Sequence, residues 1–97
     1  MEEQETSAKV EIYTLRSCPY CVRAKMLLHS KEISYIEHAV EHDEGRQKMR
    51  ERSHGHDTFP QIFINDRHVG GCYELFSLER EGRLDNLLAG EIDSLLG

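Results

Sequence analysis

The chain has 97 residues, 12 lysines and arginines, 18 aspartates and glutamates, and a formal net charge of −6. This length suits one domain with a single modest core. The acidic balance argues against nucleic acid as a partner, and no apolar run reaches membrane-spanning length. Three cysteines do not resemble a secreted disulfide scaffold, and no signal peptide is visible, so we expect a cytoplasmic protein.

The predicted elements alternate between strands and helices, which favours an α/β layered fold. Residues 1–8 are expected to form a disordered tail before a folded domain over 9–97. The first strand, over 9–15, alternates apolar and polar side chains as a half-buried strand does. Asn65 and Asp66 tolerate left-handed backbone and are predicted to form a hairpin turn. The remaining elements are expected in the order helix 19–31, strand 34–38, helix 41–53, strands 61–64 and 67–69, and helices 72–80 and 84–96.

Two cysteines lie between the first strand and the first helix, in the run Cys18-Pro19-Tyr20-Cys21. Pro19 suits the first helical position, so Cys18 is predicted at the helix N-cap and Cys21 one turn inside. Free N–H groups at a helix N-terminus favour a thiolate, the form that attacks disulfides. Cys18, at the exposed end, is therefore the predicted nucleophile, and Cys21 the resolving thiol. The surrounding residues 12–31 hold no acidic side chain and these cations: Arg16, Arg23, Lys25 and Lys31.

A lone CxxC motif also occurs in zinc sites, but a zinc site needs about four ligands. The sequence has no second CxxC and no paired histidines at ligand spacing, so no metal is expected. A pair of structural cysteines would need both thiols buried, and the polar residues Arg16 and Ser17 beside them argue against that. The position of the motif between a strand and a helix favours redox chemistry.

Two further motifs flank the predicted hairpin. Thr58-Phe59-Pro60 precedes it, either as an ordinary loop with proline at a strand start or as a cis-proline loop beside the thiols. In the second interpretation the backbone of Phe59 is free to pair with an extended substrate. Gly70-Gly71 follows the hairpin and also has two interpretations. The pair either simply ends the strand, or it lets a ligand carboxylate approach the N–H groups at the start of the next helix.

Together these three motifs, in this order and spacing, resemble those of the glutaredoxins over roughly residues 10–88. The resemblance implies a thioredoxin-like fold, with a small mixed central sheet of about four strands flanked by helices. It also implies a cis Pro60 and glutathione as co-substrate, forming a mixed disulfide with Cys18. The glutathione-binding residues that it implies are Arg16, Tyr20, Thr58, Phe59, Pro60, Gly71, Cys72, Tyr73 and Glu74.

Within that implied site, Thr58 and Phe59 would bind the tripeptide backbone, Cys72 and Tyr73 would hold its γ-glutamyl end, and Tyr20 would flank its sulfur. The departures from the family pattern all fall in this groove. Leu15 replaces a usual lysine, with Arg16 as its neighbouring substitute, and His56 replaces a common basic residue. Phe59 replaces the usual valine, and Tyr73-Glu74 replaces an acidic pair, so Glu74 is expected to bind the γ-glutamyl amine.

The resemblance implies a monomeric glutathione-dependent thiol–disulfide oxidoreductase with no nucleic-acid or membrane partner. It would reduce protein disulfides and glutathionylated proteins, and glutathione reductase with NADPH would support it indirectly. One alternative is a thioredoxin-like reductant that a flavoprotein reductase reduces directly. The presence of Leu15, where the family usually has lysine, keeps this alternative open. Another is a dimer that binds a [2Fe–2S] cluster through Cys18 and two glutathiones, which Pro19 disfavours because it stiffens the loop.

The remaining predictions concern packing. Cys72 is expected to be a small packing residue rather than a third redox thiol. Five histidines without ligand spacing are expected at the surface: His29, His38, His42, His54 and His68. The predicted core consists of Ile12, Val22, Met26, Leu27, Ile62, Ile64, Leu75, Leu84, Leu87 and Leu88.

Overall fold

The computed structural model describes residues 8–89, and the elements within them follow the predicted order. Their bounds are β1 (Val10–Thr14), α1 (Pro19–Ser30), β2 (Ile36–Ala39), α2 (Asp43–Arg52), β3 (Gln61–Ile64), β4 (Arg67–Gly70), α3 (Cys72–Arg80) and α4 (Leu84–Leu88). Most of the predicted tail over 1–8 and the predicted helical segment beyond residue 89 lie outside the described residues. Among the helices of residues 8–89, none is long and apolar enough to cross a membrane.

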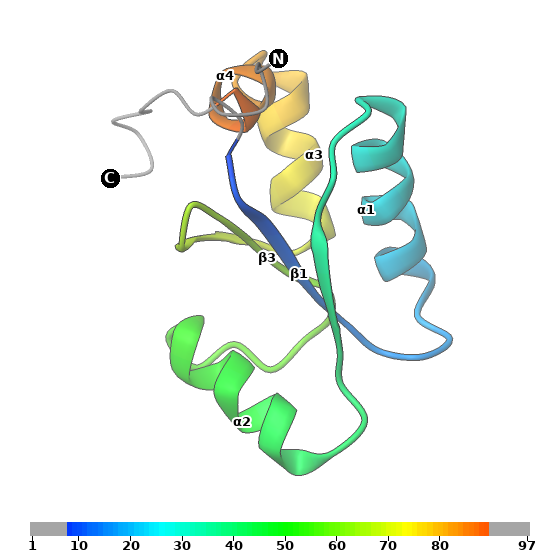
Figure 1. Cartoon of the computed structure of the whole chain (residues 1–97), viewed down its shortest axis with the longest axis vertical. Coiled ribbons are helices and arrows are strands. Elements are labelled where there is room, and N and C mark those ends of the chain that lie inside the picture. Colours follow the sequence, from blue (N-terminus) through cyan, green and yellow to red (C-terminus); the bar gives the residue numbers. More distant parts are fainter. Residues whose placement is uncertain (1–7, 90–97) are drawn as a thin grey trace.

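The strands form one mixed sheet in the order β2-β1-β3-β4. Strand β1 pairs in parallel with β2 and antiparallel with β3, and β3 pairs antiparallel with β4. The hairpin turn falls where predicted, with Asn65 and Asp66 at φ angles of 53° and 66°. Helices α1 and α3 lie on one side of the sheet and α2 on the other (Figure 1). This arrangement confirms the expected thioredoxin-like fold.

The core has two parts because helices cover both faces of the sheet. On the face of α1 and α3 it includes Val10, Ile12, Ala24, Leu28, Ile62, Ile64, Leu75, Leu78, Leu84, Leu87 and Leu88. On the face of α2 it comprises Tyr13, Val40, Met49 and Phe63. All five residues of β1 are buried. The prediction of a half-buried first strand is therefore wrong, since α2 covers the face that its polar side chains occupy.

Helix α1 presents a different face to the core than the sequence suggested. Its buried residues, Cys21, Ala24 and Leu28, recur at helical spacing along one stripe. Val22 and Met26, predicted as core, are 51% and 63% exposed. They fall off the stripe, so both predictions are wrong. Leu27, also predicted as core, is partly buried against the main cluster, and the other predicted core residues are buried.

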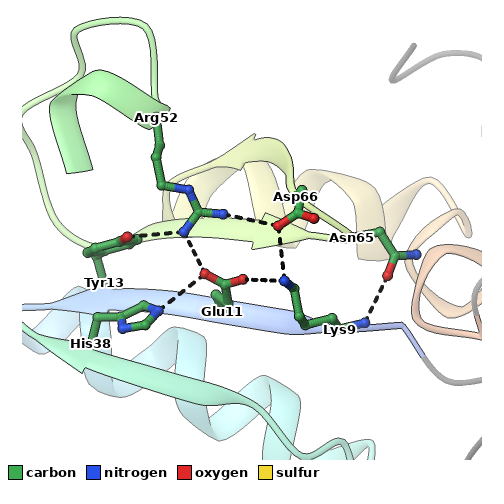
Figure 2. A network of polar contacts seen from close by, with 7 residues as sticks. All are labelled: Lys9, Glu11, Tyr13, His38, Arg52, Asn65 and Asp66. Carbon is green, nitrogen blue, oxygen red and sulfur yellow. Dashed lines mark hydrogen bonds and ion pairs between the residues drawn. The ribbon is translucent and has the colours of Figure 1, made fainter. Parts of the chain in front are cut away.

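Beneath α2 the sheet carries a polar cluster, which we call the Glu11 network (Figure 2). The Glu11 side chain is only 8% exposed and lies 2.5 Å from Arg52 Nη1 and 3.3 Å from Lys9 Nζ. The network consists of Lys9, Glu11, Tyr13, His38, Arg52 and Asp66. His38 is half-buried within it, and 39% of its side chain is still exposed, which agrees with the prediction that this histidine lies at the surface. His68 is also half-buried, with its Nε2 2.5 Å from Gln61 Oε1.

Candidate active site at the start of helix α1

Cys18 occupies the N-cap of α1, as the sequence predicts. Its backbone is extended, with φ −102° and ψ 110°, and Pro19 begins the helix. The N–H of Cys21 donates a hydrogen bond to the Cys18 sulfur over 3.4 Å. A sulfur in this position lies at the positive end of the helix dipole, beside the N–H groups of the first turn.

Cys21 lies one turn inside the helix and differs from Cys18 in burial. It is 2% exposed, whereas Cys18 is partly exposed. Burial, together with the hydrogen bond to Cys18, raises the pKa of Cys21 from 9.0 to about 12. Cys21 is therefore a neutral thiol at physiological pH, and Cys18 is the more accessible of the two sulfurs.

Fewer cations surround the thiols than the sequence indicated. Lys25 Nζ lies 3.0 Å from Glu37 Oε2, so a carboxylate offsets part of its effect. Lys31 follows the last turn of α1, where carboxylates of α3 and α4 hold it at 2.9 and 2.7 Å. A helix of 12 residues is about 18 Å long, which separates Lys31 from the thiols. The prediction of a local cluster of cations is therefore wrong for Lys31, and Arg16 and Arg23 remain near the start of the helix.

The loop before β3 packs against the thiols. The Phe59–Pro60 peptide bond is cis, as the resemblance implied. The Cys18 sulfur lies 3.8 Å from the Phe59 carbonyl oxygen, to which its S–H can donate. The carbonyl and hydroxyl oxygens of Thr58 each accept a hydrogen bond from Gln61 Nε2 at 3.1 Å. Of the two interpretations of this motif, the loop beside the thiols is the observed one.

Helix α2 anchors this loop through contacts that the sequence did not reveal. Asp57 accepts hydrogen bonds from Arg46 over 2.9 Å and from Arg50 over 3.3 Å. The guanidinium of Arg46 also lies over the ring of Phe59, 5.1 Å from its centre. Only the pairing of helix and loop brings these residues together, so no sequence spacing could have identified them.

The glycine motif brings the start of α3 to the same loop. Gly71 is the N-cap of α3, and a Cβ atom there would lie 3.1 Å from the carbonyl oxygen of Pro60. Gly70 has a φ of 129°, which disfavours other residues. Glu74 Oε1 accepts the Gly71 N–H at 2.8 Å, so this carboxylate caps the helix. Gly71 therefore lets the start of α3 approach this loop closely, and Gly70 provides the backbone conformation that leads into the helix.

The other predicted site residues lie around this centre. Tyr20 is 57% exposed and Tyr73 is 72% exposed. Cys72 is partly buried, and burial raises the pKa of its thiol above 9.0. Arg16 lines a cavity of about 200 Å³ that both Cys18 and Cys21 also line. Within residues 8–89, no group of three or more histidine, cysteine or acidic residues is arranged to hold a metal ion.

Comparison with known proteins identifies the family. The Glutaredoxin family model matches residues 10–69. A probable glutaredoxin of Synechocystis is 51% identical over 83 residues, covering 84% of this chain and 76% of that protein. The chain belongs to the glutaredoxin family. Like other glutaredoxins, it is a thiol–disulfide oxidoreductase.

Solved glutaredoxins share the fold. The solution structure of glutaredoxin from Brucella melitensis is 50% identical, with a TM-score of 0.77, covering 88% of this chain and 92% of that one. A buckwheat glutaredoxin in complex with glutathione is 25% identical, with a TM-score of 0.72, covering 94% of this chain and 88% of that one.

Proposed function

We propose that this glutaredoxin uses glutathione to reduce disulfides, with Cys18 as nucleophile and Cys21 as resolving thiol. The observation that carries this proposal is the contrast between the two sulfurs. Cys18 caps the helix and is partly exposed, whereas Cys21 is 2% exposed and its pKa is raised to about 12, mainly by burial. An accessible sulfur at a helix N-terminus suits the first attack, and a protected one suits the second.

The proposed reaction begins when the Cys18 thiolate attacks a substrate disulfide. A bond forms between Cys18 and one substrate sulfur, and the other sulfur leaves as a thiolate that takes a proton from water. Cys21 then loses its proton and attacks Cys18, which forms the Cys18–Cys21 disulfide and releases the reduced substrate. Two glutathione molecules return the pair to dithiols and become glutathione disulfide. With a glutathionylated substrate, external glutathione can instead resolve the mixed disulfide at Cys18.

The proposed glutathione groove runs along the loop before β3 and the start of α3. Thr58, Phe59 and Pro60 would meet the tripeptide backbone, as a strand partner does. Gly71, Cys72 and Tyr73 would bind the γ-glutamyl end with Glu74, while Tyr20 and Arg16 would border the cysteinyl and glycyl parts. The glutathione complex of the buckwheat glutaredoxin supports this choice of ligand.

The test is reduction of a glutathione mixed disulfide coupled to glutathione reductase and NADPH, with thioredoxin reductase assayed in parallel. Cys21→Ser should retain this activity but lose most reduction of an intramolecular protein disulfide, because only the second reaction requires the resolving thiol. Cys18→Ser should abolish both reactions. Cys72→Ser removes the third thiol of the chain but leaves Cys18 and Cys21 in place, so it should retain both reactions in their wild-type ratio.

Two outcomes would contradict the proposal. Activity that depends on thioredoxin reductase and not on glutathione would favour the thioredoxin-like alternative. Loss of the glutathionylated substrate in Cys21→Ser would mean that Cys21 does more than resolve the mixed disulfide.

A further inference from the structure

A charged pair lies in the cavity beside the buried thiol. The cavity, of about 200 Å³, is lined by Cys21, Lys25, Glu37 and Thr14 among other residues. Lys25 Nζ lies 3.0 Å from Glu37 Oε2, and the Thr14 hydroxyl donates to the same oxygen over 2.7 Å. The two side chains are 28% and 35% exposed, so solvent screens them less than it screens a fully exposed pair.

Helical spacing directs Lys25 toward Cys21. The two residues are four positions apart on α1, so they occupy the same face of the helix, one turn from each other. Although burial dominates the pKa of Cys21, the positive charge of Lys25 acts against it and favours the thiolate. Glu37 contributes the opposing negative charge from β2.

We propose that the Lys25–Glu37 pair sets the reactivity of the resolving thiol, with Lys25 promoting its ionisation and Glu37 limiting it. This inference rests on the proposed dithiol function. In the second step the Cys21 proton leaves to water, the Cys21–Cys18 bond forms and the glutathione sulfur departs from Cys18 as a thiolate. The ammonium of Lys25 stabilises the Cys21 thiolate that forms on the way, and it neither accepts nor donates a proton. Lys25 and Glu37 are thus positioning residues that act through Cys21.

Other charged groups near Cys21 are weaker candidates for this role. Arg16, from the loop before α1, and Glu41, after β2, line the same cavity with opposite charges. Both are exposed, so water and salt screen them. Cys18, the other titratable group beside Cys21, is held in the mixed disulfide and carries no charge during the resolving step.

The proposal predicts opposite effects of two substitutions in one ion pair. Lys25→Met removes the ammonium and leaves the Glu37 carboxylate unbalanced in the cavity that Cys21 also lines, so it should slow disulfide closure about threefold to tenfold. Glu37→Gln keeps an oxygen that can accept from Thr14 and leaves the ammonium unbalanced, so closure should accelerate by a similar or smaller factor. Lys31→Met, which breaks a lysine–carboxylate pair at the far end of α1, is the matched control and should leave closure unchanged.

Closure is measured by mixing the reduced protein with glutathione disulfide, quenching with acid at successive times and quantifying the Cys18–glutathione mixed disulfide by mass spectrometry. The pH profile of closure should move to higher pH in Lys25→Met and to lower pH in Glu37→Gln. A purely structural role of the pair would move both variants in the same direction and would overturn the proposal, as would no change in either.

Failure of the inference can be separated from failure of the proposed function. If Cys21→Ser loses protein-disulfide reduction while Lys25→Met and Glu37→Gln close at the wild-type rate, the dithiol cycle stands and the role of the pair is wrong. If Cys21→Ser still reduces protein disulfides, the dithiol function itself is wrong.

Discussion

Glu11 beneath α2 and Cys21 in the first turn of α1 are both buried ionisable groups, yet Glu11 is charged at neutral pH and Cys21 is not. Burial alone would raise the pKa of Glu11, but hydrogen bonds from Arg52 and His38 outweigh it and lower the value from 4.5 to about 2. Lys9 and Arg52 both reach the Glu11 carboxylate (Figure 2). Burial also raises the pKa of Cys21, and there it prevails, giving a value of about 12.

The difference lies in the partners rather than in the burial. The Glu11 carboxylate has two cations and a histidine in direct contact, which offset the cost of removing it from water. Of the cations near Cys21, Lys25 is the one that lowers its pKa, and Lys25 is shared with Glu37. The Glu11 network therefore holds a permanent charge that ties α2 to the sheet, whereas the thiol end of α1 keeps a group neutral until the reaction requires its charge.

The largest expected effect is on the thiols. We expect limiting iodoacetamide at neutral pH to modify Cys18 at least about a hundredfold faster than Cys21, because alkylation requires an accessible thiolate. Peptide mass spectrometry after timed quenching would give both rates. In Cys18→Ser, Cys21 should remain slow, since burial and not competition protects it. Comparable rates at the two sulfurs would mean that they do not differ in environment as described.

The next effect concerns the cation that holds Glu11. Arg52→Met should lower the free energy of unfolding by about 3 kcal/mol, because it leaves a buried carboxylate with part of its partners. Urea unfolding would measure the loss. Arg50→Met removes one partner of the more exposed Asp57 and should lower the free energy of unfolding by less than Arg52→Met does. Equal losses of unfolding free energy in the two variants would show that burial of Glu11 does not make its ion pair with Arg52 more stabilising than an exposed pair.

Acid should weaken the Glu11 network in a defined pH range. Because the folded-state pKa of Glu11 is depressed from 4.5 to about 2, its contribution is complete above the ordinary value and is lost as pH falls toward 2. Near neutral pH, the free energy of unfolding of the wild type should exceed that of Glu11→Gln by about 1–3 kcal/mol. This difference should become smaller as the pH falls from 4.5 toward 2. Glu51→Gln, at an exposed position on α2, is the control. A gap that does not depend on pH would exclude this ionisation as its source.

Local signals in the sequence were sufficient for most of the fold. Pro19 located the start of α1, Asn65 and Asp66 the hairpin turn, and Gly70-Gly71 the start of α3. These signals work because each depends on backbone preferences of one or two residues. The short edge strand was less well located, predicted over 34–38 and observed at Ile36–Ala39, since its burial pattern is mostly exposed and gives little periodicity.

Features that depend on tertiary contacts could not be predicted in the same way. Helix α1 has apolar residues on several sides. Its packing against the sheet determines that Ala24 and Leu28 are buried while Val22 and Met26 stay exposed. Glu37 reaches the thiol end only because parallel pairing of β2 with β1 places it there. Lys25 was among the cations that the sequence indicated near the thiols, and its spacing of four residues from Cys21 is visible in the sequence.

The smallest expected effect extends the comparison to an exposed charge. Leu15 is 38% exposed and lines the cavity beside the thiols, where the resemblance implies a lysine for the glycyl carboxylate of glutathione. Leu15→Lys should contribute about 0.2–1 kcal/mol, at most about a fivefold gain in apparent glutathione affinity. The gain should shrink at high salt, unlike the contribution of the Glu11 network. Arg16→Ala should act in the opposite direction if Arg16 now binds that carboxylate.

The dependence of turnover on glutathione concentration, determined for Leu15→Lys and Arg16→Ala at low and high salt, would measure the two effects. Met26→Lys adds the same charge on the exposed side of α1 and is the control. If Leu15→Lys and Arg16→Ala both leave the dependence unchanged, the carboxylate lies elsewhere in the groove, and an equal gain in Met26→Lys would indicate general attraction instead of an ion pair.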